Sequence, residues 1–126
     1  MDGKTLLDTA QERAEQLPAT TLYSFEPGWE AVRVHEKWFL LLTEVPGQPV
    51  VILKSDPGEA EALRKIYADI TPGYHMNKRH WITLAPGGSI DTKLVRELVT
   101  ESYRLVVSNL PKSRQPVDPA TFGVRG

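Results

Sequence analysis

The chain has 126 residues, the common size of a single domain with one hydrophobic core. With 40% hydrophobic residues, 25% charged residues and a net charge of −1, its composition is that of a globular protein rather than a disordered or membrane protein. Cysteine is absent, which excludes disulfides, thiolate metal sites and thiol nucleophiles. No apolar run approaches 18 residues and no signal-peptide core is visible, so we expect a cytoplasmic protein that does not bind membranes.

Charge is unevenly divided along the chain. Residues 1–70 contain 7 Lys/Arg and 12 Asp/Glu, whereas residues 71–126 contain 8 and 4. This division has two possible meanings: a basic face for a phosphate-bearing partner, or attraction between two halves that lie side by side. Charge alone favours the attraction between halves.

The first part of the chain predicts a helix followed by strands. From Thr5 to Leu17 apolar residues recur three and four positions apart, and Pro18 ends this amphipathic helix. Four short runs rich in β-branched and aromatic residues then predict an antiparallel meander. These runs cover residues 21–25, 29–35, 37–44 and 50–54. The third is apolar at successive positions, which favours a central strand covered on both faces.

The second part predicts a helix, a strand and a longer helix. Asp56 is placed to cap a helix that extends to Ile70, and residues 80–85 are expected to form a strand. Asp91 is placed to cap a helix over residues 92–109. Residues 111–126 lack periodicity and are expected to form a loosely ordered tail.

These elements define the expected fold class. Their order, α-β-β-β-β-α-β-α, predicts one α+β domain over residues 1–110. It would contain a mostly antiparallel sheet of about five strands, with the helices packed on one face.

The stretch from Thr71 to Trp81 is the most unusual part of the sequence. It contains two of the three histidines, two adjacent cations, a tyrosine and a tryptophan. Lys78 and Arg79 could neutralise phosphate, Asn77 could donate a hydrogen bond, and the aromatic rings offer flat apolar surface. The alternative is purely structural. The aromatic rings would then belong to the hydrophobic core, and the two cations would lie at the solvent-exposed end of a loop.

Catalytic and metal-binding patterns are not found. His75 and His80 are five positions apart, which places them on opposite faces of a strand, so we predict no metal site. No nucleophile elbow is present, and Ser102 is expected to bond to a carbonyl one turn earlier in its helix. Paired carboxylates lie only on helix surfaces. We therefore predict a protein that is not an enzyme and has no cofactor.

Several segments resemble the MmcQ/YjbR family. They are PGYHMNKRHWITL at 72–84, SYRLV at 102–106, LPK at 110–112 and KWFLL at 37–41. The resemblance implies a CyaY/frataxin-like α+β fold and a DNA-binding function attributed to a double-wing arrangement of β-hairpins. It implies contacts at Lys78 and Arg79 with His75 and His80, and further contacts at Arg104, Lys112 and Arg114.

Three functions follow as hypotheses. The first is a DNA-binding protein that contacts phosphates through the basic loop and the cations of the last helix. The second is a non-enzymatic protein that binds a small anionic or aromatic ligand, and the third is a protein-interaction module that uses an exposed edge of the meander. The candidate nucleic-acid or ligand-binding residues are Tyr74, His75, Asn77, Lys78, Arg79, His80, Trp81, Arg104, Lys112 and Arg114.

Overall fold

The computed structural model describes residues 1–123, so the last three residues of the expected tail lie outside the described part. Its elements are α1 (Gly3–Gln16), β1 (Thr20–Glu26), β2 (Trp29–Val34), β3 (Lys37–Val45), β4 (Gln48–Lys54), α2 (Pro57–Ile66), β5 (Ile70–Pro72), β6 (Trp81–Leu84), α3 (Thr92–Ser108) and the 3-10 helix η1 (Lys112–Arg114). No helix of the described part has the length and apolar character needed to cross a membrane.

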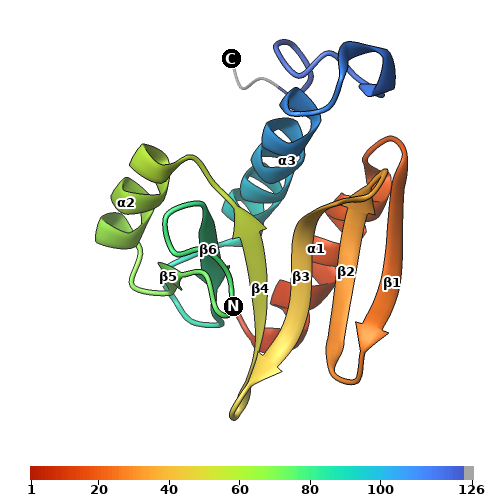
Figure 1. The fold of residues 1–126 in the computed structure, drawn as a ribbon. Helices are drawn as coiled ribbons and strands as arrows, with labels where there is room; N and C mark the ends of the chain where they lie inside the picture. The colour runs from red at the N-terminus through yellow and green to blue at the C-terminus, as the bar shows by residue number, and fades with distance from the viewer. Residues whose placement is uncertain (124–126) are drawn as a thin grey trace.

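The six strands form one antiparallel sheet in the order β1-β2-β3-β4-β6-β5. In Figure 1 α1 and α3 lie behind the sheet, and α2 lies beside β5 and β6. The predicted α+β fold with helices on one face is therefore confirmed, with six strands instead of about five.

All three helices begin at an aspartate whose carboxylate accepts backbone N–H groups of the first turn. Asp2 accepts from Thr5, Asp56 accepts from the amides of residues 58 and 59, and Asp91 accepts from Leu94. Such caps satisfy donors that have no partner inside the helix. The two caps predicted from the sequence, Asp56 and Asp91, are thus present.

The second helix is shorter than predicted. It ends at Ile66, whose side chain is 68% exposed instead of facing the core, and Ile70 begins the additional strand β5. Asp69 holds this turn in place because its carboxylate accepts the backbone N–H and the hydroxyl of Ser89, which lowers its pKa. The predicted extension of this helix to Ile70 was wrong, because the bonds between Asp69 and Ser89 and the pairing of Ile70 with Leu84 outweigh the helical periodicity of the sequence.

The main core lies between the sheet and the helices. Tyr103 of α3 is fully buried there, with its ring edge-on to Phe39 at a centroid distance of 5.4 Å. Burial raises the pKa of Tyr103 to about 12, and its hydroxyl donates to the Pro18 carbonyl at 2.7 Å. This bond fastens α3 to the end of α1.

A β-bulge changes the direction of side chains in β3. Val32 pairs with Leu40 but Arg33 pairs with Trp38, so Phe39 is an extra residue in the ladder. Phe39 and Leu40 consequently both enter the helix-side core, while Trp38 turns to the opposite face with Leu41. β3 is therefore a central strand with apolar residues buried on both faces, as predicted, and the bulge adds Phe39 to the helix side beside Leu40.

Ser102 of α3 occupies a gap between two strands. The β3–β4 ladder ends at Leu40 and Leu53, and the next pair in register would be Phe39 and Lys54. Instead, the Ser102 hydroxyl donates to the Phe39 carbonyl at 2.6 Å and accepts the Lys54 N–H at 2.9 Å. The predicted hydrogen bond from the Ser102 hydroxyl to a carbonyl of its own helix was therefore wrong, because the hydroxyl takes the place of a hydrogen bond between β3 and β4.

The segment after α3 folds back onto that helix. The Arg104 guanidinium donates twice to the Pro119 carbonyl, and the Phe122 ring lies 5.8 Å from that of Tyr103. The part of the expected loose tail that the structure describes, residues 111–123, thus includes contacts with α3.

Ser102→Ala would leave the Phe39 carbonyl and the Lys54 N–H without their shared partner. We expect the free energy of unfolding to fall by about 2–4 kcal/mol, measured by urea denaturation. Ser108→Ala is the matched control because its exposed hydroxyl bonds only to Leu105 of the same helix, and its effect should stay within about 0.5 kcal/mol. Equal effects of the two substitutions would contradict the role of Ser102.

Candidate functional site

The sheet face opposite the main core carries a group of aromatic side chains, which we call the aromatic face. Its partly buried members and Trp81 surround a second cluster formed by Ala31, Leu41 and Ile52. The aromatic face consists of Tyr23, Phe25, Trp29, Trp38, Tyr74, Met76 and Trp81. It includes all three tryptophans of the chain. Within residues 1–123 it receives side chains from strands and from the loop 73–80, and from no helix.

The rings of the aromatic face contact one another in defined geometries. Trp29 and Tyr74 are stacked, with an interplanar angle of 4° and centroids 6.1 Å apart, and Phe25 lies 4.7 Å from Trp38. The Trp38 indole N–H donates to the Tyr23 hydroxyl at 2.6 Å. Contacts of this kind hold the rings in place before any ligand arrives.

The loop 73–80 is held in its conformation by bonds of its own. The Asn77 side-chain oxygen accepts the backbone N–H groups of Arg79 and His80, at 2.9 Å and 3.2 Å. The Lys78 ammonium donates to the Gly73 carbonyl. Asn77 and Lys78, two predicted contact residues, therefore bond within the loop itself.

A cavity of about 350 Å³, which we call the aromatic cavity, opens on this face. It is lined by Phe25, Glu26, Trp29, Trp38, Leu41, His75 and Met76. Its volume and mostly apolar walls are typical of small-molecule sites. Glu26 and His75 are the two titratable residues of this lining. The aromatic rings of the lining provide flat faces on which a planar molecule can stack.

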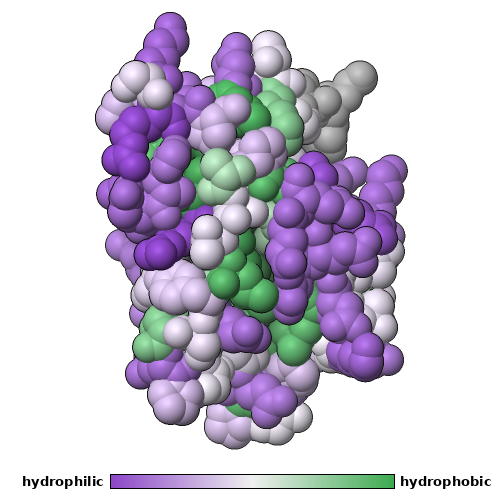
Figure 2. Space-filling view, turned by 90° about the vertical axis from the view of Figure 1, so that its right-hand side faces the viewer, coloured by the Kyte–Doolittle hydropathy of each residue, from purple (hydrophilic) through white to green (hydrophobic). Residues whose placement is uncertain are grey.

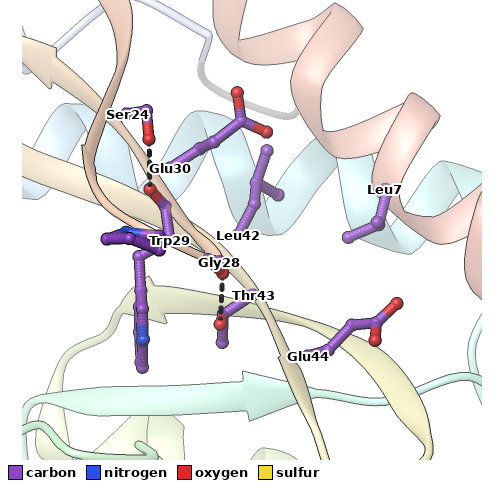
Figure 3. Close-up of a pocket in the computed structure, with 9 residues that line it drawn as sticks. Leu7, Ser24, Gly28, Trp29, Glu30, Leu42, Thr43 and Glu44 are labelled. Atoms are coloured by element: carbon purple, nitrogen blue, oxygen red, sulfur yellow. Dashed lines mark hydrogen bonds between the residues drawn. The ribbon is translucent and has the colours of Figure 1, made fainter.

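A larger cavity of about 580 Å³ lies between α1 and the first three strands. Figure 2, which looks at the β1 edge, shows hydrophobic surface in the middle of that side between more hydrophilic surfaces. In Figure 3 the carboxylates of Glu30 and Glu44 lie on different sides of Leu42 and do not converge. The Thr43 hydroxyl already bonds to the Gly28 carbonyl, and Trp29 is the single aromatic residue of this lining, so this cavity offers fewer ring faces than the aromatic cavity.

The predicted site residues separate into two groups. Tyr74, His75 and Trp81 join the aromatic face or its cavity, and His75 has a positive φ of 59° that turns its ring to within 4.1 Å of Tyr74. Arg79 and His80 are exposed, and within residues 1–123 their side chains have no hydrogen-bonding or ion-pair partner.

The cations expected from the last helix and the tail are mostly engaged. Arg104 forms an ion pair with Glu101 at 2.7 Å, and both side chains are partly buried. Arg114 pairs with Glu36 at 3.2 Å and lowers the pKa of that carboxyl. Lys112 is exposed on η1. DNA contact through these residues stays a prediction.

Residue-level analysis of the sequence missed five of the seven side chains of the aromatic face. Tyr23 and Phe25 alternate in β1, a signal that could have placed both on one face. The alternation of β3 could not place Trp38 in the same way, because the bulge changes the sheet face on which the Trp38 side chain lies. Within residues 1–123 no group of three His, Asp or Glu side chains is arranged to hold a metal ion.

These features define an α+β protein with helices on one sheet face and a cluster of aromatic side chains on the other. The YjbR family model matches residues 15–105, and the chain belongs to the YjbR family. It is 41% identical to the uncharacterized protein YbdF of Escherichia coli O157:H7 over 116 residues, covering 91% of this chain and 95% of YbdF. It is 36% identical to the uncharacterized protein YjbR of Escherichia coli K12 over 89 residues, covering 69% of this chain and 75% of YjbR.

Solved structures share the fold. The Deinococcus radiodurans protein DR2400, of the family-model domain DUF419, superposes with a TM-score of 0.81 at 26% identity, over 95% of each chain. A Pseudomonas syringae protein, target PsR293, superposes with a TM-score of 0.65 at 30% identity, over 83% of this chain and 98% of that one. These relatives carry the fold, and their names state no function.

Gly73→Ala should disturb the aromatic face. A Cβ at Gly73 would lie 2.5 Å from the Trp81 Cβ and 3.0 Å from its backbone, so the loop or β6 must shift. We expect a loss of about 1–3 kcal/mol of stability and a changed tryptophan emission spectrum. Gly88→Ala is the control, because nothing lies within 4 Å of a Cβ there. An unchanged spectrum in Gly73→Ala would contradict the close packing.

Proposed function

We propose that this protein is a non-enzymatic binding protein for a small planar aromatic ligand, held in the aromatic cavity. The observation that carries the proposal is the concentration of every tryptophan on the one sheet face that no described helix covers. Contiguous apolar surface of this kind commonly marks a binding site in a globular protein. A planar ring entering the cavity would stack on side chains that are already aligned.

Preorganisation supports this proposal. Trp38 is fixed by its bond to Tyr23, and Tyr74 is fixed by its stack on Trp29 and by the bond from its backbone N–H to Thr83. Binding therefore has to order few side chains, and this keeps the entropic cost of association low.

The chemistry of the lining favours binding over catalysis. Within residues 1–123 no hydroxyl is hydrogen-bonded to the imidazole of His75 or the carboxylate of Glu26, so the cavity lacks an activated nucleophile beside a base. The remaining lining side chains are apolar or aromatic. We therefore propose a role in holding a molecule rather than converting it.

The proposal predicts saturable binding of N-phenyl-1-naphthylamine, a neutral dye with a planar naphthalene ring that becomes fluorescent in apolar sites. Trp29→Ala should weaken this binding roughly five- to tenfold because it removes one wall of the cavity and the stacking partner of Tyr74. Met76→Ala, which truncates a flexible lining side chain, should weaken it less. Dye titration followed by fluorescence gives the dissociation constants.

Ile66→Ala serves as the control for hydrophobic truncation, since Ile66 is a large exposed apolar side chain on α2 outside the cavity. Circular dichroism should show that each variant is folded. Dye affinity that is equal in wild type, Trp29→Ala and Met76→Ala would refute the proposal.

DNA binding is the second candidate function, supported by the exposed side chains of Arg79, His80 and Lys112. The cations Arg104 and Arg114, which the resemblance implies as contacts, form ion pairs with acidic residues. We propose that any DNA contact is centred on Arg79, with few phosphates neutralised. The affinity would then be modest and the salt dependence shallow.

This candidate predicts that labelled DNA binds at low salt and dissociates as salt rises. Arg79→Ala should reduce the slope of log affinity against log salt by about one unit, measured by fluorescence anisotropy. Lys93→Ala, at an exposed position in the first turn of α3, should leave the slope unchanged. Absence of binding at low salt would eliminate DNA as a partner.

A further inference from the structure

A third cavity, of about 450 Å³, lies where β3 and β4 separate, and we call it the lysine cleft. It is lined by Glu36, Lys37, Trp38, Lys54, Trp81, Val106 and Asn109. Ser102 separates the two strands at this point because its hydroxyl stands between Phe39 and Lys54. On its other side, Lys54 remains paired with Trp81 of β6. The cleft is thus a product of the sheet geometry.

The lysine cleft is positively charged. Lys37 and Lys54 contribute two ammonium groups, and within residues 1–123 neither side chain has a hydrogen-bonding or ion-pair partner. The only carboxylate of the lining, Glu36, is paired with Arg114, which compensates its charge. An anion in this cleft would therefore meet two unpaired cations.

The carboxyl-terminal end of α3, which is the negative end of the helix dipole, also lies at the cleft. Hydrogen bonds to its last carbonyl groups reduce the repulsion of an anion by this dipole. The Asn109 N–H donates to the Val106 carbonyl, and the Leu110 N–H donates to the Val107 carbonyl. Carbonyl groups that already accept hydrogen bonds present less unsatisfied partial charge at a helix end. The two lysines consequently dominate the charge of the cleft.

Trp38 belongs to the lining of both this cleft and the aromatic cavity, so the two cavities are neighbours that share one residue. The two cavities differ in charge. The aromatic cavity contains the carboxylate of Glu26, whereas the cleft contains Lys37 and Lys54. A molecule that extends past Trp38 into both cavities would be oriented by this difference in charge, with its negative end away from Glu26.

We infer that the ligand is a planar aromatic acid, with its ring in the aromatic cavity and its anionic group bound by Lys37 and Lys54 in the lysine cleft. This inference rests on the proposed function and adds the chemical class of the ligand. Aromatic contacts supply most of the buried area, and the two ammonium groups select for an acidic substituent.

A pair of dyes with the same ring system tests the inference. 8-Anilinonaphthalene-1-sulfonate carries a sulfonate, and N-phenyl-1-naphthylamine lacks it. We expect the wild-type protein to bind the sulfonate dye at least about fivefold more tightly at low salt, because charge-assisted hydrogen bonds add to the stacking. Lys37→Gln combined with Lys54→Gln should remove this preference and leave the affinity for the neutral dye unchanged.

Lys93→Gln is the matched control, since it removes one exposed lysine at the opposite end of α3 from Asn109. Equal affinity of the wild-type protein for both dyes would overturn the inference while leaving the proposed function intact. A preference that survives in the double variant, or that falls as much in Lys93→Gln, would also overturn it. Saturable binding of neither dye would contradict the proposed function itself.

Discussion

The position of one buried hydroxyl determines where β3 and β4 separate and joins α3 to the sheet. Ser102 has no exposed surface, and it replaces a direct bond between Phe39 and Lys54 with two bonds through its own oxygen. The backbone groups of the two strands therefore remain satisfied although the strands have separated. This separation opens the lysine cleft on one side and fastens α3 to the sheet on the other.

The bulge beside Ser102 decides which side chains reach the aromatic face. An extra residue at Phe39 sends two neighbouring side chains into the helix-side core and leaves Trp38 on the other face. Without it, Trp38 and Leu41 would point to opposite faces, because side chains in a strand alternate. The aromatic cavity and the lysine cleft share Trp38 as a wall, so both depend on this irregularity.

The uneven distribution of charge along the chain has a partly structural explanation. The ion pair of Arg114 with Glu36 joins the basic second part to the acidic first part, as expected if the two parts attract each other. Arg104 instead pairs within the second part, with Glu101, and binds the carbonyl of Pro119. These cations hold the segment after α3 in place, which leaves fewer of them for a polyanionic partner.

Local signals in the sequence determined the α+β class, the meander and the helix starts at Asp56 and Asp91, because turns, caps and periodicity act over a few residues. They also determined that the loop before Trp81 belongs to a candidate site. The tertiary structure alone decided the strand at Ile70, the insertion of Ser102 and the face on which Trp38 lies. These features depend on register and on contacts between distant residues, and a shift of one residue in a strand moves every following side chain to the other face.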